Sequence, residues 1–247
     1  MLVPTDVGPL WLPADDEVIT PWLAEYGTWE VAEGSEIRRL LQPGMTFVDI
    51  GANVGYFTLL ASDAVGEDGW VISLEPEPDN YALLCANIWD HRCTNVEPLC
   101  AAAASTSRPA VLALSETNCG DHRAYHRPDL QYVRVTGVRV DDVVRPDARV
   151  DVIKIDIQGT DHRAVLGMER TLERCHPTLL VEFWPSGIAE AGDRPVDVLS
   201  YYHSLGFKIQ ILEQPGVVYA PDRFQELVRI VEQSELTFAT LLLRLGM

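Results

Sequence analysis

The residues with the clearest chemical potential are four carboxylates, each of which ends a short apolar stretch typical of a strand. They are Asp49, Glu75, Asp156 and Glu182. Ligands of open α/β sheets bind outside the carboxyl ends of the strands, so side chains at those ends share one site. Carboxylates there accept hydrogen bonds from ribose hydroxyls, bind cations or take a proton from a substrate. The positions of these acids therefore predict one ligand site along one edge of a sheet.

A glycine turn follows the first of these strands. Residues 47–50 form an apolar run with β-forming side chains, Gly51 interrupts the run, and helical spacing begins after Gly55. Glycines let the backbone turn sharply and let a ligand approach without meeting a Cβ atom. The helix start beyond offers unpaired N–H groups and a positive dipole end, which favour a polar or anionic ligand group.

The glycine spacing and Glu75 together predict the kind of ligand. Gly51 and Gly55 have the spacing G-x-x-x-G, whereas dinucleotide folds carry G-x-G-x-x-G. Glu75 lies about 20 residues beyond the turn, where an acid accepts hydrogen bonds from ribose hydroxyls. The pattern predicts a nucleoside without a pyrophosphate, and it disfavours a nicotinamide dehydrogenase.

Four stretches resemble the FkbM-type family of S-adenosylmethionine-dependent methyltransferases. They are residues 47–58 (FVDIGANVGYFT), residues 71–78 (VISLEPEP), residues 83–87 (LLCAN) and residues 152–159 (VIKIDIQG), the last of which is similar to the family's strand-four motif. The resemblance runs from about residue 26 to about residue 184 and implies a class I methyltransferase with S-adenosyl-L-methionine as its cofactor. The family has an acid where this chain has Gln158 and a Glu where it has Asp161, so no catalytic role is carried over to these two positions.

The resemblance also implies which residues contact the cofactor. Those residues are Glu30, Asp49, Gly51, Ala52, Asn53, Gly55, Tyr56, Phe57, Glu75, Pro76, Ala102 and Asp156. The turn and Glu30 would lie at the methionine end and Glu75 at the ribose. Small side chains at residues 100–103 would leave room for an adenine ring, or would serve tight helix–sheet packing instead.

By the same resemblance, Asp156, His162 and Glu182 face the transferred methyl group and are the candidate catalytic residues. Asp156 is the first choice to orient the acceptor or take its proton, and His162 is the second. Alternatives stay open for both: His162 as a helix-face residue without a role, and Asp156 in a structural pair with Lys154, on the same face of the strand. A divalent cation held by Asp156 and Glu182 is a further alternative. Two carboxylates without a third ligand do not favour it, so no metal site is predicted.

A polar loop at residues 115–129 separates two predicted strands. It carries Asn118, Gly120, His122, Tyr125 and His126. Long polar loops in compact domains are usually functional or disordered. His122 and His126 are therefore candidates for substrate binding, with a solvated role as the alternative.

Composition restricts the class of protein further. The 247 residues, 47% of them hydrophobic, suffice for one globular α/β domain. No apolar run approaches the length of a membrane span, and the first residues do not resemble a signal peptide. The five scattered cysteines fit reduced thiols in a cytoplasmic protein. A net charge of −18 argues against nucleic acid as substrate; it permits a cationic substrate or serves solubility alone.

Alternating strand and helix patterns predict a Rossmann-like, doubly wound, seven-stranded, mainly parallel sheet with an N-terminal cap segment. Residues 1–247 are expected to form one domain, with 1–41 as the cap and helical lead-in and 42–247 as the core. Strands are predicted at residues 47–50, 69–75, 95–99, 109–114, 132–136, 150–157, 178–183, 207–212 and 236–243. Helices are predicted at residues 33–41, 80–89 (capped by Asp79), 160–175, 196–205 and 222–233, with a short helical turn near 139–144.

The function expected from all this is methylation of a small molecule in natural-product biosynthesis, with O-methylation of a natural-product or sugar hydroxyl favoured. The alternatives are N-methylation of an amino sugar and a non-catalytic S-adenosylmethionine-binding module. No nucleic acid or membrane partner is expected. The oligomeric state stays open, with a homodimer among the options.

Overall fold

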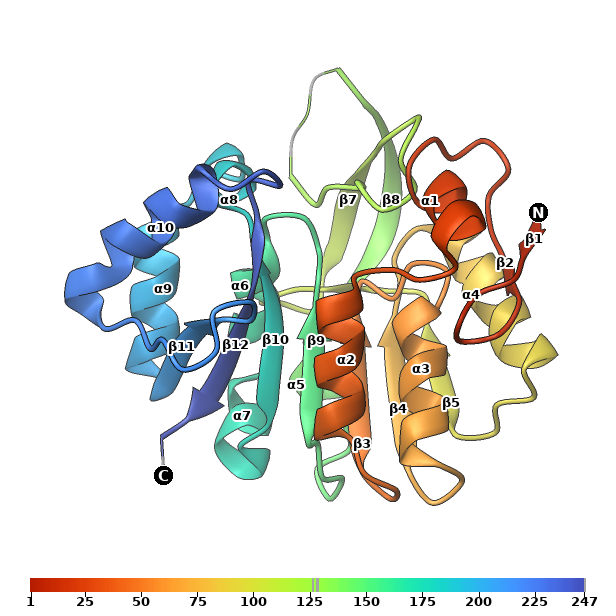
Figure 1. Cartoon of the computed structure of the whole chain (residues 1–247), viewed down its shortest axis with the longest axis horizontal. Helices are drawn as coiled ribbons and strands as arrows, with labels where there is room; N and C mark the ends of the chain where they lie inside the picture. The colour runs from red at the N-terminus through yellow and green to blue at the C-terminus, as the bar shows by residue number, and fades with distance from the viewer. Residues whose placement is uncertain (126, 128, 247) are drawn as a thin grey trace.

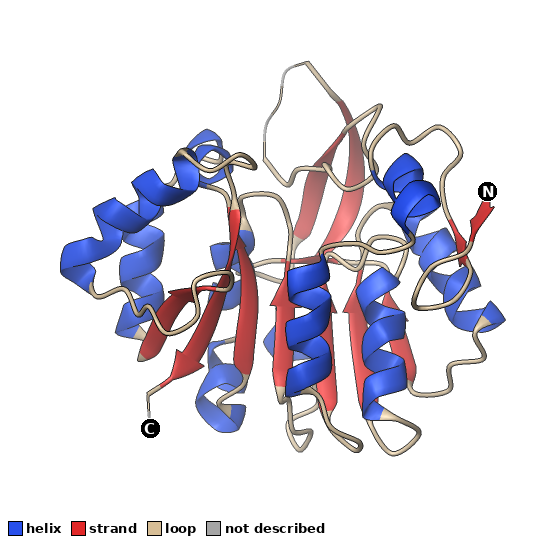
Figure 2. Ribbon diagram, viewed as in Figure 1, coloured by secondary structure: helices blue, strands red, loops and turns tan. Residues whose placement is uncertain are grey.

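A seven-stranded sheet forms the centre of the molecule (Figures 1 and 2). The structure, a computed structural model, describes residues 1–125, 127 and 129–246. The strand order is β11-β12-β10-β9-β3-β4-β5, and only β12 runs antiparallel to its neighbours. The strands are β3 (Thr46–Ile50), β4 (Trp70–Leu74), β5 (Val96–Leu99), β9 (Val152–Ile155), β10 (Thr178–Phe183), β11 (Phe207–Ile211) and β12 (Ala239–Leu245). The predicted doubly wound, mainly parallel sheet is confirmed.

Helices cover both faces of this sheet. They are α1 (Ile19–Tyr26), α2 (Val31–Leu40), α3 (Tyr56–Val65), α4 (Pro78–Asp90), α5 (Val140–Val143), α6 (Asp161–Leu166), α7 (Glu169–Cys175), α8 (Pro185–Glu190), α9 (Pro195–Ser204) and α10 (Phe224–Glu232). Side chains alternate along β3, so Phe47 packs into the core under α2 and α3 while Val48 and Ile50 pack into the core on the opposite face. Burial on both faces explains why the central strands read as nearly continuous apolar runs.

Smaller elements complete the fold. β1 (Leu2–Val3) pairs with β2 (Leu10–Trp11), and this N-terminal hairpin lies beside α4 in Figure 1. β6 (Ala102–Ala103), β7 (Pro109–Leu114) and β8 (Gln131–Val138) form a separate three-stranded sheet in the order β6-β8-β7. β7 and β8 extend beyond the carboxyl ends of the central strands in Figure 1. The segment that joins them, residues 115–130, is called the β7–β8 loop below.

Several predicted boundaries were wrong. The helix expected at 160–175 is two helices, α6 and α7, because the chain turns at Gly167, where an added Cβ would lie 2.1 Å from the Ala104 carbonyl oxygen. The last strand begins at Ala239, and the predicted start at residue 236 lies in a loop. The cap of α4 is Glu77, whose side chain accepts a hydrogen bond from the Asn80 N–H, and Asp79 lies inside the helix.

The structure also bears on two compositional expectations. In the part of the chain that the structure describes, no helix is long and apolar enough to cross a membrane. All five cysteines are free thiols.

Candidate active site

A cavity of about 410 Å³ lies at the carboxyl ends of β3, β4, β9 and β10. Residues of α1 and of the β7–β8 loop complete its lining. Eleven of the fourteen predicted site residues line it: Glu30, Gly51, Ala52, Asn53, Tyr56, Phe57, Glu75, Pro76, Ala102, Asp156 and Glu182. The structure therefore brings together most of the residues that the sequence assigned to one site.

Three predicted site residues do not line the cavity. Asp49 is 1% exposed and its Oδ2 accepts a hydrogen bond from Thr58 Oγ1 at 2.7 Å, so its carboxylate faces α3. Gly55 begins α3 at a φ of 98°, where an added Cβ would lie 2.7 Å from Leu84 Cδ1. His162 lies on α6 with its Nε2 3.1 Å from Asp193 Oδ2. These three residues therefore lie outside the cavity lining.

Gly51 lines the cavity, but the reason for its lack of a side chain differs from the expected one. Its φ is 82°, and an added Cβ would lie 1.9 Å from the backbone oxygen of Asp156. The close neighbour is therefore the end of strand β9, and the glycine is required by packing between two strand ends. Approach of a ligand is not the constraint that excludes a Cβ here.

Glu75 has the geometry expected of a ribose-binding acid. Its Oε2 accepts a hydrogen bond from the Asn53 N–H at 2.8 Å and its Oε1 accepts one from the Glu77 N–H at 2.9 Å. Each carboxylate oxygen accepts more than one hydrogen bond, so both keep capacity for hydroxyl donors. Burial raises the pKa of Glu75 to about 8, against the opposing effect of the two backbone N–H groups. The backbone thus fixes this carboxylate in the cavity wall.

The residues near Glu75 fit a nucleoside ligand. Ala52, Ala102 and Ala103 present small side chains to the cavity, next to the Pro76 ring. The cavity volume falls within the range of small-molecule sites, which is about 300–1,000 Å³. A flat base and a ribose therefore find an apolar slot and a fixed acid on the same wall.

The opposite wall holds the charged residues. Lys154 Nζ lies 3.1 Å from Asp156 Oδ2 and 3.8 Å from Glu30 Oε2. It also lies 4.5 Å from the centre of the Phe57 ring. The ion pair with Asp156 is the structural pair that strand alternation allowed. Although burial lowers the pKa of Lys154, the carboxylates of Asp156 and Glu30 raise it overall, and the ammonium stays protonated.

Glu182 is the acid of this wall without a salt-bridge partner among the described residues. Gln158 Nε2 donates to Asp156 Oδ1 at 2.8 Å and to Glu182 Oε2 at 3.2 Å, so one amide joins the two carboxylates. Burial, and then the negative charge of Asp156, raise the pKa of Glu182 well above its ordinary value. Burial also raises the pKa of Glu30 to about 8, against the effect of Lys154.

Asp156 and Glu182 were the alternative oxygen ligands for a divalent cation. Over residues 1–125, 127 and 129–246, no group of three or more His, Cys, Asp or Glu side chains could hold a metal ion. The Gln158 amide nitrogen donates a hydrogen bond to each of the two carboxylates.

Sequence reasoning missed part of the lining. Asp121, Arg123, Trp184 and the segment before β12 (residues 236–238) all contribute to the cavity. The sequence pattern of residues 236–238 predicts the start of a strand, so this segment was not expected to line the cavity. The length of the β7–β8 loop was the one available signal for Asp121 and Arg123, and it did not identify them.

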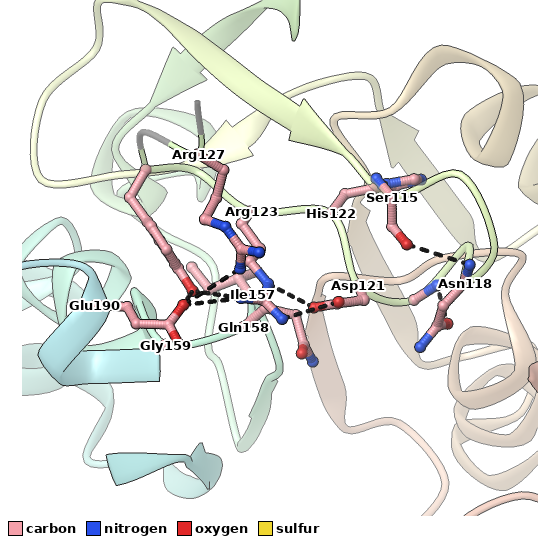
Figure 3. A network of polar contacts seen from close by, with 12 residues as sticks. Ser115, Asn118, Asp121, His122, Arg123, Arg127, Ile157, Gln158, Gly159 and Glu190 are labelled. Carbon is pink, nitrogen blue, oxygen red and sulfur yellow. Dashed lines mark hydrogen bonds and ion pairs between the residues drawn. The ribbon is translucent and has the colours of Figure 1, made fainter. Parts of the chain in front are cut away.

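His122, one of the two histidines suggested for substrate binding, lines the cavity. Figure 3 shows its position in the β7–β8 loop. The Ser115 N–H donates to its Nδ1 at 3.1 Å, which places the proton of the neutral imidazole on Nε2. Burial lowers the pKa of His122. Asn118 and Gly120 also line the cavity, whereas Tyr125 is buried beside it. His126 lies outside the described residues.

Comparison with protein families gives one extended match. The family profile described as the methyltransferase FkbM domain matches residues 49–209. No curated protein sequence matches the chain.

Solved structures share the fold at low sequence identity. A methyltransferase FkbM from Methylobacillus flagellatus is 15% identical with a TM-score of 0.51, and the match covers 85% of this chain and 50% of that one. The present chain thus spans about half the length of that protein. An rRNA methylase from Streptococcus thermophilus is 13% identical, with a TM-score of 0.50 and coverage of 87% and 95%. A Streptococcus mutans protein in complex with SAH is 9% identical, with a TM-score of 0.51 and coverage of 86% and 94%.

Proposed function

This chain belongs to the FkbM methyltransferase domain family, and we propose that it methylates a hydroxyl group of a small molecule. S-adenosyl-L-methionine is the cofactor, and it supplies a methyl group activated by a sulfonium centre. The observation that carries the proposal is the two-walled cavity. One wall holds a fixed acid beside a glycine turn, and the other holds two carboxylates joined by an amide.

The cofactor wall would hold the nucleoside part. Glu75 would accept hydrogen bonds from the ribose hydroxyls, because its two oxygens are already oriented by backbone N–H groups. Ala102 and Pro76 would contact the base, and the turn at residues 51–54 together with Glu30 would lie at the methionine end. Methyl transfer is an in-line displacement, so accurate positioning by these residues supplies much of the catalysis.

The opposite wall would handle the proton of the acceptor. A hydroxyl must lose its proton as it is methylated, and an acid with a raised pKa is suited to take it near neutral pH. Glu182 is the better candidate for this role, since Asp156 is held by Lys154 and Gln158. Asp156 would then orient the acceptor and keep Gln158 in place.

A small acceptor is favoured over a nucleic acid, although rRNA methylases share the fold. With 37 acidic against 19 basic residues, the protein repels phosphate backbones over most of its surface. A hydroxyl of a natural product or a sugar fits this proposal. The five free thiols support a reducing, cytoplasmic location.

One observation favours an amine acceptor as the second candidate. Glu30, Asp156 and Glu182 line the cavity around the ammonium of Lys154. A cationic amino sugar beside these groups would favour the ionised forms of Glu30 and Glu182, whose pKa values burial raises. An amine must still arrive at the methyl group unprotonated, and Glu182 could take its proton too.

Two measurements test the function. Calorimetry should show binding of S-adenosylhomocysteine and no binding of NAD. Transfer of an isotope-labelled methyl group to a panel of hydroxyl and amine acceptors should then label a hydroxyl compound. Label in amines alone would favour the second candidate, and binding without any transfer would favour a non-catalytic binding module.

A further inference from the structure

Two attachments of the β7–β8 loop involve side chains, and they differ in kind. The first is a half-buried anchor at Cys119. Its carbonyl oxygen accepts hydrogen bonds from Asn53 Nδ2 at 2.9 Å and from Asn80 Nδ2 at 2.8 Å. Its N–H donates to Asp16 Oδ1 at 2.9 Å. Because Asn53 also belongs to the glycine turn, this anchor ties the loop directly to the cofactor wall.

The second attachment is the side chain of Arg123 (Figure 3). Its Nε and Nη2 donate to the two oxygens of Asp121 at 2.7 and 2.9 Å. Its Nη1 donates to Tyr125 Oη at 3.1 Å and to Glu190 Oε2 at 3.0 Å. The guanidinium carbon lies 4.6 Å from the centre of the Trp184 ring. The guanidinium thus contacts two carboxylates and the face of an aromatic ring. These contacts use its donors and balance its charge, so it is poorly suited to bind an anionic acceptor.

Arg123 and Trp184 both line the cavity, whereas Glu190 does not. Glu190 is the last residue of α8 and its side chain is 46% exposed. Its Oε2 also accepts from Tyr125 Oη at 3.2 Å and from Arg127 Nη1 at 3.3 Å. One exposed carboxylate on a separate helix therefore accepts hydrogen bonds from three side chains of the β7–β8 loop.

We propose that Glu190 is a positioning residue for the acceptor side of the cavity. Through Arg123 it holds the β7–β8 loop against α8 and keeps the guanidinium on Trp184, so that the two form a continuous wall opposite Glu75. Loss of this contact frees the outer part of the loop, while the anchor at Cys119 holds the inner part. The inference rests on the proposed function, since the cavity that this wall closes would hold the cofactor together with the acceptor.

The test compares Glu190→Ala and Glu190→Gln with Glu226→Ala in the full chain. Glu226 is a matched control, because its exposed carboxylate on α10 pairs with Arg223, the residue before that helix, and does not contact the loop. The probe is S-adenosylhomocysteine, whose dissociation rate is measured by stopped-flow mixing. The expected effect is modest, because exposed ion pairs each contribute little. We expect S-adenosylhomocysteine to dissociate about three- to tenfold faster from Glu190→Ala than from the parent protein. We expect partial rescue in Glu190→Gln, which keeps a hydrogen-bond acceptor, and no change in Glu226→Ala.

A second readout needs no ligand. The Arg123 N–H donates to the Ala113 oxygen at 2.9 Å, and the Ala113 N–H donates to the Arg123 oxygen at 2.8 Å. Hydrogen exchange at these two amides should speed up in Glu190→Ala, with unchanged exchange in β3 and β4 and an unchanged melting temperature. Unaltered exchange at both amides, or an unaltered dissociation rate, would overturn the role of Glu190. Failure of the parent protein to bind S-adenosylhomocysteine would instead overturn the proposed function, and the exchange measurement would still decide whether Glu190 holds the loop.

Discussion

The two walls of the cavity are held together by different forces. On the cofactor wall, Gly51 packs against the backbone of β9, and Glu75 accepts two backbone N–H groups. On the wall opposite Glu75, called the acceptor wall below, the largely buried Arg123 side chain forms an ion pair with Glu190, whose side chain is 46% exposed. The first wall is held by the backbone of the sheet. The second wall begins with the acids at the ends of β9 and β10, and its outer part is assembled from side chains on a loop and a short helix.

This difference predicts unequal rigidity. Backbone packing and buried hydrogen bonds are costly to break, since an unpaired buried group costs about 1–3 kcal/mol. An exposed ion pair contributes about 0–1 kcal/mol. We therefore expect the cofactor wall to keep its shape while the acceptor wall opens and closes, as an enzyme that admits a second substrate requires.

The strongest test of the rigid wall is Gly51→Ala. The new Cβ would lie 1.9 Å from the Asp156 backbone oxygen at a φ of 82°. Backbone strain and overpacking add, so the free energy of unfolding should fall by about 3–5 kcal/mol. Urea denaturation of the purified variant measures this loss.

Gly44→Ala is the matched control for that substitution. Gly44 has nearly the same φ, 83°, but nothing lies within 4 Å of an added Cβ. The variant should lose only the cost of the left-handed conformation, about 1–2 kcal/mol. Equal losses in the two variants would show that the strand-end contact at Gly51 contributes nothing.

The next largest effect is expected at Glu182. Glu182→Gln keeps the size of the side chain and removes its basicity, so turnover should fall by about 10²-fold, the lower end for a lost general base. The affinity for S-adenosylhomocysteine should stay unchanged. Turnover is measured with the acceptor that takes up the labelled methyl group.

Asp156→Asn separates catalysis from structure on the same wall. The substitution removes the carboxylate that forms an ion pair with buried Lys154. The free energy of unfolding should therefore fall by about 1–3 kcal/mol. We expect a smaller loss of turnover than in Glu182→Gln. If turnover falls further in Asp156→Asn than in Glu182→Gln, the proton acceptor is Asp156.

The fourth prediction concerns the affinity of the cofactor wall. Glu75→Ala leaves the ribose hydroxyls without their acceptor and should weaken S-adenosylhomocysteine binding by about 1–3 kcal/mol. Calorimetry measures the change, with Glu226→Ala as a control that should bind with the parent affinity. Unchanged affinity in Glu75→Ala would place the ribose elsewhere.

The contrast between the walls also explains what the sequence could predict. The glycine turn, Glu75 and the acids that end β9 and β10 were predictable because strand ends and turns leave local patterns over a few residues. The orientation of Asp49 was not, since Thr58 of α3 decides which way its carboxylate points. Its position within the motif carried no information about that partner.

The acceptor wall was largely hidden because its contacts join segments far apart in the chain. Arg123 meets Glu190 67 positions further on, and Cys119 meets Asp16 103 positions back. Such pairs depend on how the whole sheet is wound, and one sequence contains no local trace of them. The position of His162 outside the cavity lining was hidden for a similar reason, since its partner Asp193 lies in the loop after α8.

The smallest expected effect is a dependence of stability on pH that belongs to the cofactor wall. Glu75 is 5% exposed, and burial raises its pKa from 4.5 to about 8. Between these two values the folded protein keeps the proton while the unfolded chain has released it. Raising the pH therefore favours unfolding, by about 1.4 kcal/mol for each pH unit spanned. The stabilising contribution is complete below pH 4.5 and is lost as the pH rises through 8.

Without ligand, the parent protein should therefore be less stable at pH 7 than at pH 6, and Glu75→Gln should reduce that difference by about 1 kcal/mol. Some slope should remain, because burial raises the pKa of Glu30 to about 8 as well. Urea denaturation at the two pH values gives both free energies. Glu190→Gln, which removes an exposed carboxylate from the other wall, should keep the slope of the parent. An equal slope in the parent and in Glu75→Gln would mean that water reaches the Glu75 carboxylate in the ligand-free protein, and that the cofactor wall is as open as the wall opposite.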